Sequence, residues 1–315
     1  MIVARMRARR GMRISEQHID HLNEKGYVLV DDFLTLSELA ECQAATARYF
    51  PSGLEILATP QRYAHLEKVA SFPFACQVLN EVSTHPRLID FLERVHGTTE
   101  LRLGESALQA KYGPAVDAGA HDQFLHVDTW GKKSLLYPRD DGPFRQTFMI
   151  IYYSDVTADL GPTCVVSKEH TRDLALLTAD RHTFRRPEDY PQLYQHEQPI
   201  LARAGSVLIF SAATLHRGTA VTTPAGVRYA HFITYHAAAA TWLQSLAWPS
   251  GDRPHPDSAA LQRFLETGTA RQREMLGFPA PGHPYWNAAT LQGVSERYPG
   301  MDMTPYAEHL ERRAG

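Results

Sequence analysis

The sequence predicts a mainly β fold with flanking helices, a double-stranded β-helix (jelly roll) of the cupin-like kind. Between positions 101 and 240, six segments are rich in β-branched and aromatic residues, a composition typical of strands. The pairs Gly113-Pro114, Gly142-Pro143 and Gly161-Pro162 lie between these segments and favour turns. No helical segments alternate with them and no Gly-x-Gly-x-x-Gly motif occurs, which disfavours a parallel nucleotide-binding sheet. Two antiparallel sheets packed face to face are the economical arrangement.

The chain is expected to form one domain over residues 14–315, because no Pro-, Gly- or Ser-rich linker divides it and no repeat appears. The basic stretch 1–13 is expected to be a disordered extension. Within the domain we expect mostly helical support over 14–100, the jelly-roll core over 101–240, and a helical and loop-rich cover over 241–315.

The helical support has recognisable start and stop signals. A helix over 14–25 is expected to end at Gly26, since glycine adopts the left-handed backbone conformation that stops helices. Thr35 and Glu38 have the spacing of a capping box, which predicts a helix that runs to about Phe50. The other expected elements are a strand over Tyr27–Val30 and helical pieces over 75–96, the second beginning near Pro86.

Six core strands are predicted from their apolar, β-branched and aromatic residues. Successive side chains of a strand point to opposite faces, so each strand can present alternate residues to the space between the sheets. The predicted strands are Leu101–Lys111, Phe124–Thr129, Thr147–Ser154, Thr163–Val166, Ser206–Phe210 and Arg228–His236.

Composition excludes several functional classes. A net charge of −3 does not indicate a nucleic-acid or membrane-surface partner. Cys42, Cys76 and Cys164 have no zinc-type spacing and are expected to be buried, unpaired thiols of a reducing compartment. The N-terminal stretch lacks the apolar core of a signal peptide, and no run reaches the ~18 apolar residues of a membrane span. We therefore expect a cytoplasmic protein, a monomer or homodimer, that acts on a small molecule.

Three His-x-Asp motifs occur, and only one has the context of a metal site. The motif at His18 lies in a predicted helix, where residues i and i+2 do not share a face. The motif at His255 has a proline between its two polar residues and lies in a loop. His126 and Asp128 lie in a predicted strand, where i and i+2 point to the same side. Together with His216 they make the two-histidine, one-carboxylate set that binds ferrous iron and leaves positions open.

Arg228 opens the last core strand and is suited to a carboxylate co-substrate. Its strand neighbours on the same face, Ala230 and Phe232, are small or apolar, so a guanidinium there needs a partner. The planar fork of arginine pairs with carboxylate oxygens bidentately, and the distal carboxylate of 2-oxoglutarate would supply them. The alternative is an arginine at a strand end that reaches solvent. Gln109 and Lys111 share a face of an earlier strand, and either could hydrogen-bond the keto acid, although a solvent-facing Lys111 is the ordinary interpretation.

The chain resembles the phytanoyl-CoA dioxygenase family of Fe(II)/2-oxoglutarate-dependent oxygenases over about residues 14–240. Four segments carry the resemblance: Gly26–Leu34 with the helix after it, His126–Trp130, Gly161–His170, and Gly205–Phe210 running into His216-Arg217-Gly218. The family's usual Pro-Gly-Ser-His is replaced here by Ser-Lys-Glu-His at 167–170, and Gly218 stands where some relatives have a serine that faces the keto acid.

The resemblance implies His126, Asp128 and His216 as iron ligands, Arg228 as the main 2-oxoglutarate anchor and Gln109 as a second contact. It also implies oxidation of an unactivated C–H bond with Fe(II), 2-oxoglutarate and O2, and release of succinate and CO2. The presence of Asp128 favours oxygenation over halogenation, because halogenating relatives have a small residue in its place.

The substrate is expected to be a small, specialised metabolite. Trp130, Phe144 and Lys111 are the expected pocket residues, although buried aromatic side chains are more often core. The segment 131–146 is either a lid over the mouth or a solvated loop, and the aromatic tail 276–286 either packs across the barrel or forms a dimer contact. The alternative function is a non-redox jelly-roll protein, either a ligand-binding module or a metal-dependent isomerase or hydrolase.

Overall fold

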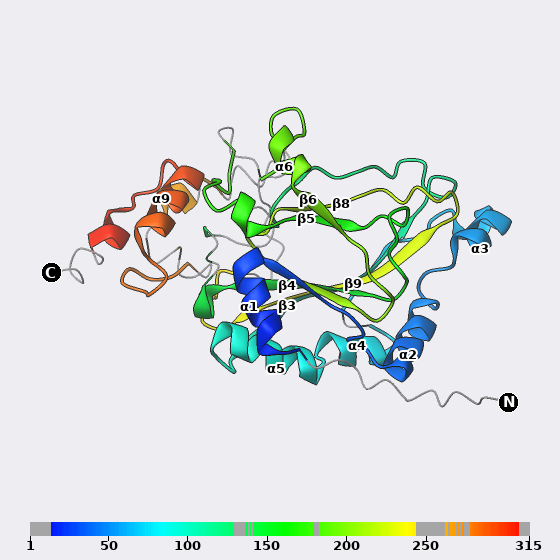
Figure 1. Ribbon diagram of the computed structural model, residues 1–315. Helices are drawn as coiled ribbons and strands as arrows, with labels where there is room; N and C mark the ends of the chain where they lie inside the picture. Colours follow the sequence, from blue (N-terminus) through cyan, green and yellow to red (C-terminus); the bar gives the residue numbers. More distant parts are fainter. Residues whose placement is uncertain are drawn as a thin grey trace.

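The computed structural model describes residues 14–308 except 73, 129–135, 138, 140, 179–182, 244–261, 264, 269, 271–272 and 274–277. Its strands form two antiparallel sheets, with orders β1-β7-β4-β9-β3-β2 and β6-β5-β8. The larger sheet contains β1 (Tyr27–Val30), β2 (Val69–Ser71), β3 (Leu101–Tyr112), β4 (Gln146–Tyr152), β7 (Val207–Ser211) and β9 (Val227–Ala237). The smaller sheet contains β5 (Thr163–Val166), β6 (Glu197–Ile200) and β8 (His216–Gly218). Figure 1 shows the smaller sheet stacked over the larger one, which confirms the predicted jelly roll with its sheets not closed.

Helices from the N-terminal third cover the outer face of the larger sheet, as expected. Val28, Met149 and Ile209 of the sheet lie in one buried cluster with Leu79 and Phe91 of the helices. No helix among the described residues is long and apolar enough to span a membrane. The helices are α1 (Glu16–Lys25), α2 (Leu36–Thr46), α3 (Gly53–Ala58), η1 (Pro60–Tyr63), α4 (Gln77–Ser83), α5 (Pro86–His96), η2 (Gly142–Phe144), η3 (Lys168–His170), α6 (Pro191–Gln195) and α9 (Ala288–Arg297).

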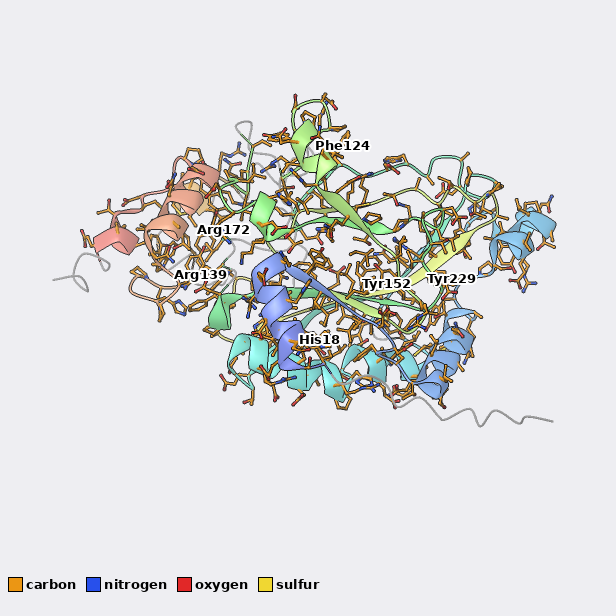
Figure 2. All side chains as sticks on the ribbon, in the orientation of Figure 1. His18, Phe124, Arg139, Tyr152, Arg172 and Tyr229 are labelled. Atoms are coloured by element: carbon orange, nitrogen blue, oxygen red, sulfur yellow. The ribbon has the colours of Figure 1, made fainter. Side chains whose placement is uncertain are left out.

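The inner face of the larger sheet packs against the smaller sheet. Phe148, Ile150 and Leu208 share a buried cluster with Val165 of β5. Tyr152, labelled in Figure 2, is fully buried in the same cluster, and its hydroxyl reaches the Thr163 hydroxyl of the opposite sheet at 3.3 Å. Side chains alternate along each strand, so the larger sheet contributes to a core on each of its faces. One core lies under the helices and the other lies between the two sheets.

The local signals in the helical third operate as predicted, apart from one helix end. Gly26 has φ 85° and its N–H donates to the last turn of α1. The Thr35 hydroxyl accepts from the Glu38 N–H at 3.2 Å, and the Glu38 carboxylate accepts from the Thr35 N–H at 2.7 Å. The helix ends at Thr46 and not near Phe50, and a turn continues to Phe50, whose N–H donates to the Thr46 carbonyl at 3.0 Å. Pro51 cannot extend this turn because it has no N–H.

The predicted strand Phe124–Thr129 is the main difference from expectation. Only two isolated bridges form there, Leu125 with Arg185 and His126 with His216, and Thr129 lies outside the described residues. The partner strand β8 has only three residues, so it offers few backbone groups to continue a ladder. The sequence analysis did not predict the short strands β2, β6 and β8.

The described part of the C-terminal region packs on the segment after the metal motif. Leu136 and Phe144 lie in a buried cluster with Trp242, Tyr285 and Val294 of α9. The Tyr285 hydroxyl donates to the Tyr137 carbonyl at 2.6 Å. Gly293 of α9 touches the ring of Tyr137, because an added Cβ would lie 2.1 Å from its Cδ2 atom. In Figure 1 this region lies at one end of the sheets, around α9.

We expect Gly293→Ala to lower the free energy of unfolding by about 1–3 kcal/mol, the usual cost of overpacking a filled core. Helix propensity alone would act in the opposite direction, since alanine is favoured over glycine by about 1 kcal/mol in a helix. Urea denaturation measures the difference. The control is Gly119→Ala, where the new Cβ would meet only the Asp117 carboxylate at 3.8 Å. A Gly293→Ala protein as stable as the parent would contradict the packing described.

Candidate metal centre

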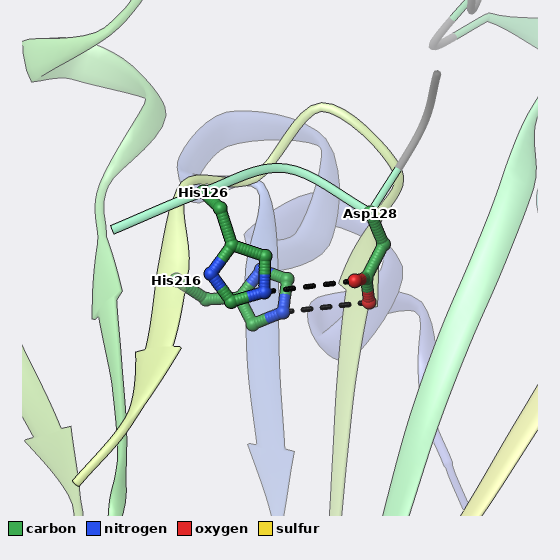
Figure 3. Close-up of side chains that lie close together, drawn as sticks. All are labelled: His126, Asp128 and His216. Atoms are coloured by element: carbon green, nitrogen blue, oxygen red, sulfur yellow. Dashed lines mark ion pairs between the residues drawn. The ribbon is translucent and has the colours of Figure 1, made fainter. Parts of the chain in front are cut away.

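Three polar side chains from two distant segments meet at the mouth between the sheets. The backbone N–H of His126 donates to the His216 carbonyl at 2.9 Å, and the His216 N–H donates back to the His126 carbonyl at 2.9 Å. This reciprocal pair places the two imidazole rings side by side, with centroids 4.6 Å apart. Asp128, two residues beyond His126, directs its carboxylate at both rings, as Figure 3 shows.

The donor atoms are close enough to share one ion. Nε2 of His126 lies 3.6 Å from Oδ1 of Asp128, and Nε2 of His216 lies 3.4 Å from Oδ2 of the same carboxylate. One ligand atom from each residue falls within 4.8 Å of the other two. Two ligands of an ion at ~2.0–2.2 Å from each lie at most about 4.4 Å apart, so both His–Asp separations are compatible with a small transition-metal ion.

Backbone carbonyls orient both imidazoles toward the carboxylate. Nδ1 of His126 is 2.7 Å from the Phe124 carbonyl, and Nδ1 of His216 is 3.0 Å from the Thr214 carbonyl. A carbonyl oxygen only accepts, so Nδ1 carries the proton in each ring and Nε2 presents a lone pair. A hydrogen bond of this kind to the far ring nitrogen is what metal-binding histidines ordinarily have.

Aromatic rings close the sides of this cluster. The ring of Phe210, at the end of β7, lies 4.7 Å from the His216 ring, and the ring of Phe184 lies 5.5 Å from the His126 ring. The side chain of Asp128 is 27% exposed and that of His216 only 9%, so the site is open on the carboxylate side. The sequence analysis did not single out these two phenylalanines. Phe210 ends a strand already assigned to the core, and no local pattern marks Phe184.

Arg228 lies on the inner face of β9 and is 6% exposed. Its Nη1 donates to the Gly161 carbonyl, while its buried Nε has no hydrogen-bond partner among the described residues. No carboxylate of the described residues forms an ion pair with it, and desolvation lowers its pKa. The alternative of an arginine reaching solvent is therefore wrong: the guanidinium is buried and lacks a counter-ion within the described chain.

Lys111 faces the same interior and not the solvent, contrary to the ordinary interpretation. In the β3–β9 register Lys111 lies opposite Arg228, and Gln109 lies opposite Ala230, so all four side chains are on one face. The Lys111 ammonium donates to the Thr219 carbonyl. Desolvation, followed by repulsion from Arg228, lowers its pKa to about 8.

Gly218, where some relatives have serine, leaves space that other side chains use. A Cβ added there would lie 3.0 Å from Oε1 of Gln123 and 3.6 Å from Nζ of Lys111. The Gly218 N–H donates to that Gln123 oxygen at 2.8 Å. Gln123 therefore ties the chain before His126 to the chain after His216, a positioning role that the sequence analysis missed.

Arg217 adds a second tie between the same two segments. Its Nε and Nη2 each lie 2.7 Å from a carboxylate oxygen of Glu197, and its Nη1 lies 2.7 Å from Asp122. Bidentate pairing of this kind is geometrically specific. β8 is thereby held to β6 on one side and to the loop before His126 on the other.

Two of the expected pocket residues, Phe144 and Trp130, are not among the described contacts of the metal centre. Phe144 is buried in the C-terminal aromatic cluster, where its ring lies 5.7 Å from that of Trp242 and Arg139 stacks over it at 4.7 Å. It is thus packed as a core residue, and a role as pocket wall stays a prediction. Trp130 lies outside the described residues.

A jelly roll with two imidazoles and a carboxylate at its mouth, and a buried arginine on the adjacent inner face, defines the class of 2-oxoglutarate-dependent dioxygenases. The model of the phytanoyl-CoA dioxygenase (PhyH) family matches residues 22–230, and the chain belongs to this family. No curated protein sequence matches it.

Solved structures share the fold at low sequence identity. The epimerase SnoN in complex with Fe3+, alpha ketoglutarate and nogalamycin RO is 18% identical, with a TM-score of 0.56 over 77% of this chain and 96% of that one. EctD from S. alaskensis with 2-oxoglutarate and 5-hydroxyectoine is also 18% identical, with a TM-score of 0.54 over 81% and 94%. HygX from Streptomyces hygroscopicus with nickel and 2-oxoglutarate is 16% identical, with a TM-score of 0.51 over 72% and 88%.

We expect His126→Ala to weaken binding of Fe(II) on the order of 100-fold or more, since removal of an outer hydrogen-bond partner alone costs ~10–100-fold. Anaerobic calorimetric titration with Fe(II) measures the affinity. The control is His121→Ala, which removes an exposed imidazole whose Nδ1 contacts the Gly119 carbonyl. Equal iron affinity in the two variants would show that His126 is not a ligand.

Proposed function

We propose that the protein is an Fe(II)- and 2-oxoglutarate-dependent oxygenase that oxidises an unactivated C–H bond of a small molecule. His126, Asp128 and His216 would hold the iron, and Arg228 would hold the distal carboxylate of 2-oxoglutarate. When bound, iron and the keto acid would supply the chemistry by which dioxygen oxidises the C–H bond, with release of succinate and CO2. This chemistry requires no separate nucleophile or acid–base pair from the protein. Its residues would position the reactants and keep other C–H bonds of the substrate away from the iron.

The observation that supports this proposal best is the buried Arg228, which has no counter-ion in the part of the chain that the structure describes. Burial of an unpaired charge is costly, and such a group is retained where a ligand completes it. A carboxylate could accept hydrogen bonds from Nε and Nη2 of Arg228. It would then satisfy the buried Nε atom, while Nη1 keeps its hydrogen bond to the Gly161 carbonyl. The metal cluster provides the second attachment point for a keto acid, so both ends of 2-oxoglutarate have a partner.

Lys111 and Gln109 complete the proposed keto-acid site. Lys111 adds a second positive charge next to Arg228, which matches the two negative charges of 2-oxoglutarate. Gln109 lies two residues before Lys111 on the same face and can donate a hydrogen bond from its amide. Gly218 leaves room for the Lys111 ammonium, so lysine would take the place of the serine contact of some relatives.

Anaerobic titration of the Fe(II)-loaded protein with 2-oxoglutarate tests the function. A weak visible charge-transfer band should appear, and admission of air should convert keto acid to succinate. A non-redox ligand-binding protein, or a metal-dependent isomerase or hydrolase, would give neither signal.

We expect Arg228→Ala to raise the KM for 2-oxoglutarate by about 10–100-fold, the equivalent of the ~1.5–3 kcal/mol of a charged hydrogen-bonded pair. Iron affinity should stay unchanged, because Arg228 is not among the clustered donors. Arg203→Ala is the control, since the Arg203 side chain is 60% exposed and pairs with Asp32. An unchanged KM in Arg228→Ala would remove the main support for the keto-acid site.

We expect kcat/KM for 2-oxoglutarate to fall as the pH rises through about 8. The ammonium of Lys111 is charged below its lowered pKa and neutral above it, so attraction for the dianion is lost on the alkaline side. The charged groups around it are Arg228, Arg217, Asp122 and Asp117. In Lys111→Arg the fall should disappear, because a guanidinium stays charged over this range. Identical pH profiles in the two proteins would exclude Lys111.

A further inference from the structure

Phe184 is an exposed aromatic residue in contact with the metal donors. Its ring centre is 5.5 Å from that of the His126 ring, with 43° between the two planes. An ion held by Nε2 of His126 at ~2.0–2.1 Å would therefore lie within about 9 Å of the Phe184 ring centre. Phe184 is 37% exposed, whereas Phe210, which contacts His216, is 2% exposed. Of these two rings at the donor set, Phe184 is the one that a small molecule can reach.

The contact between Phe184 and His126 follows from a backbone pairing. Leu125 and Arg185 form an isolated antiparallel bridge, in which the Arg185 N–H donates to the Leu125 carbonyl at 2.7 Å. The flanking residues His126 and Phe184 are then opposite each other, and their side chains point to the same face. Leu125 and Arg185, whose side chains point to the opposite face, are buried. The pairing thus directs the Phe184 ring to the face that carries a proposed iron ligand.

The chain next to this ring is anchored by Arg185, which is 1% exposed. Its Nη2 donates to the Ala175 and Leu176 carbonyls at 2.6 and 3.0 Å. Its own carbonyl accepts from the Tyr194 hydroxyl at 2.6 Å, and that hydroxyl accepts from the Leu125 N–H at 3.0 Å. Buried contacts of its neighbours therefore fix the position of the exposed ring, so the ring can be substituted while the backbone pairing is kept.

The proposed reaction leaves one oxygen atom without a destination when no substrate is bound. Reduction of O2 takes four electrons: two come from 2-oxoglutarate as it becomes succinate and CO2, and two come from the C–H bond that is oxidised. One oxygen atom enters succinate and the other enters the oxidised C–H bond. A phenylalanine ring offers C–H bonds of its own. In the balanced alternative, Phe184, 2-oxoglutarate and O2 give a ring with one hydroxyl group, succinate and CO2, so that one ring C–H is replaced by C–O–H.

We propose that Phe184 faces the substrate position and that its ring is hydroxylated when 2-oxoglutarate is consumed without a substrate. This inference rests on the proposed oxygenase function. The ring gains one oxygen atom and becomes that of a tyrosine. A bound substrate lies over the exposed ring and receives the oxygen atom in its place. Because exposed apolar surface at a functional site is suited to an apolar part of a ligand, the substrate contacts Phe184 through such a part.

The first test is incubation of the full chain with Fe(II), 2-oxoglutarate and air, with no substrate added. The intact mass should rise by one oxygen atom, peptide mapping should place that atom on Phe184, and isotopically heavy dioxygen should supply it. Phe184→Ala should lose this modification but should still form succinate. Phe72→Ala is the matched control, because Phe72 is 44% exposed but directly follows β2 at the edge of the larger sheet, and this variant should still be modified at Phe184.

A second test needs no turnover and measures whether the ring position is close to the bound ion. In Phe184→Trp, the emission of the added tryptophan should fall several-fold when Co(II) is bound and should persist with Zn(II), because a paramagnetic ion quenches a ring that lies close to it. In Phe72→Trp the two ions should have the same effect. The emission of the parent protein, measured with the same ions, is subtracted as the background of its four tryptophans.

The role of Phe184 and the proposed function can fail separately. Succinate formation with an unmodified Phe184, an oxygen atom on Phe210 instead, or equal emission of Phe184→Trp with Co(II) and Zn(II) would overturn the role of Phe184 alone. Absence of succinate in the parent protein would overturn the oxygenase function, and the hydroxylation of Phe184 would be excluded with it.

Discussion

The candidate centre depends on the reciprocal backbone pair between His126 and His216. Two hydrogen bonds of 2.9 Å join segments that are far apart in the chain, and they are formed outside any regular ladder. The side chains around this pair repeat the same connection: Gln123 binds the backbone at Gly218, and Arg217 binds Asp122. Since the imidazoles are directed by their own neighbouring carbonyls, the geometry of the donor set follows from the backbone pairing.

Charge complements this geometry. The interior between the sheets is lined by aromatic and aliphatic side chains, yet two cations, Lys111 and Arg228, lie opposite each other within it. Desolvation lowers the pKa of both, which shows that the folded chain opposes their charge. An arrangement of this kind is poorly explained by stability and well explained by an anion that arrives later. The proposed keto acid would correct this electrostatic imbalance.

The jelly roll was predictable because it depends on local strand patterns. The three donors were predicted from their residue types and the family resemblance, although segment 124–129 forms isolated bridges and not the predicted strand. Strand alternation placed His126 and Asp128 on one side, and the strand context separated this motif from those at His18 and His255. The position of Lys111 was not predictable, because its burial depends on Gly218 and Thr219, which come from another sheet. The end of α2 at Thr46 was not predictable from Pro51, which only limits a helix to Phe50 or earlier. β8 is too short, at three residues, to show a period, and β6 has the sequence Glu-Gln-Pro-Ile, whose proline and two polar residues do not indicate a strand.

The contact between Gly293 and Tyr137 separates two tasks along the chain. The donors and the buried cations belong to the family region, whereas the support under Tyr137 comes from a helix beyond it. A change in the tail can therefore move the Tyr137 ring while the donor set stays intact. The last segment of such a chain is free to vary and to alter the surroundings of Tyr137 without any substitution in the family region.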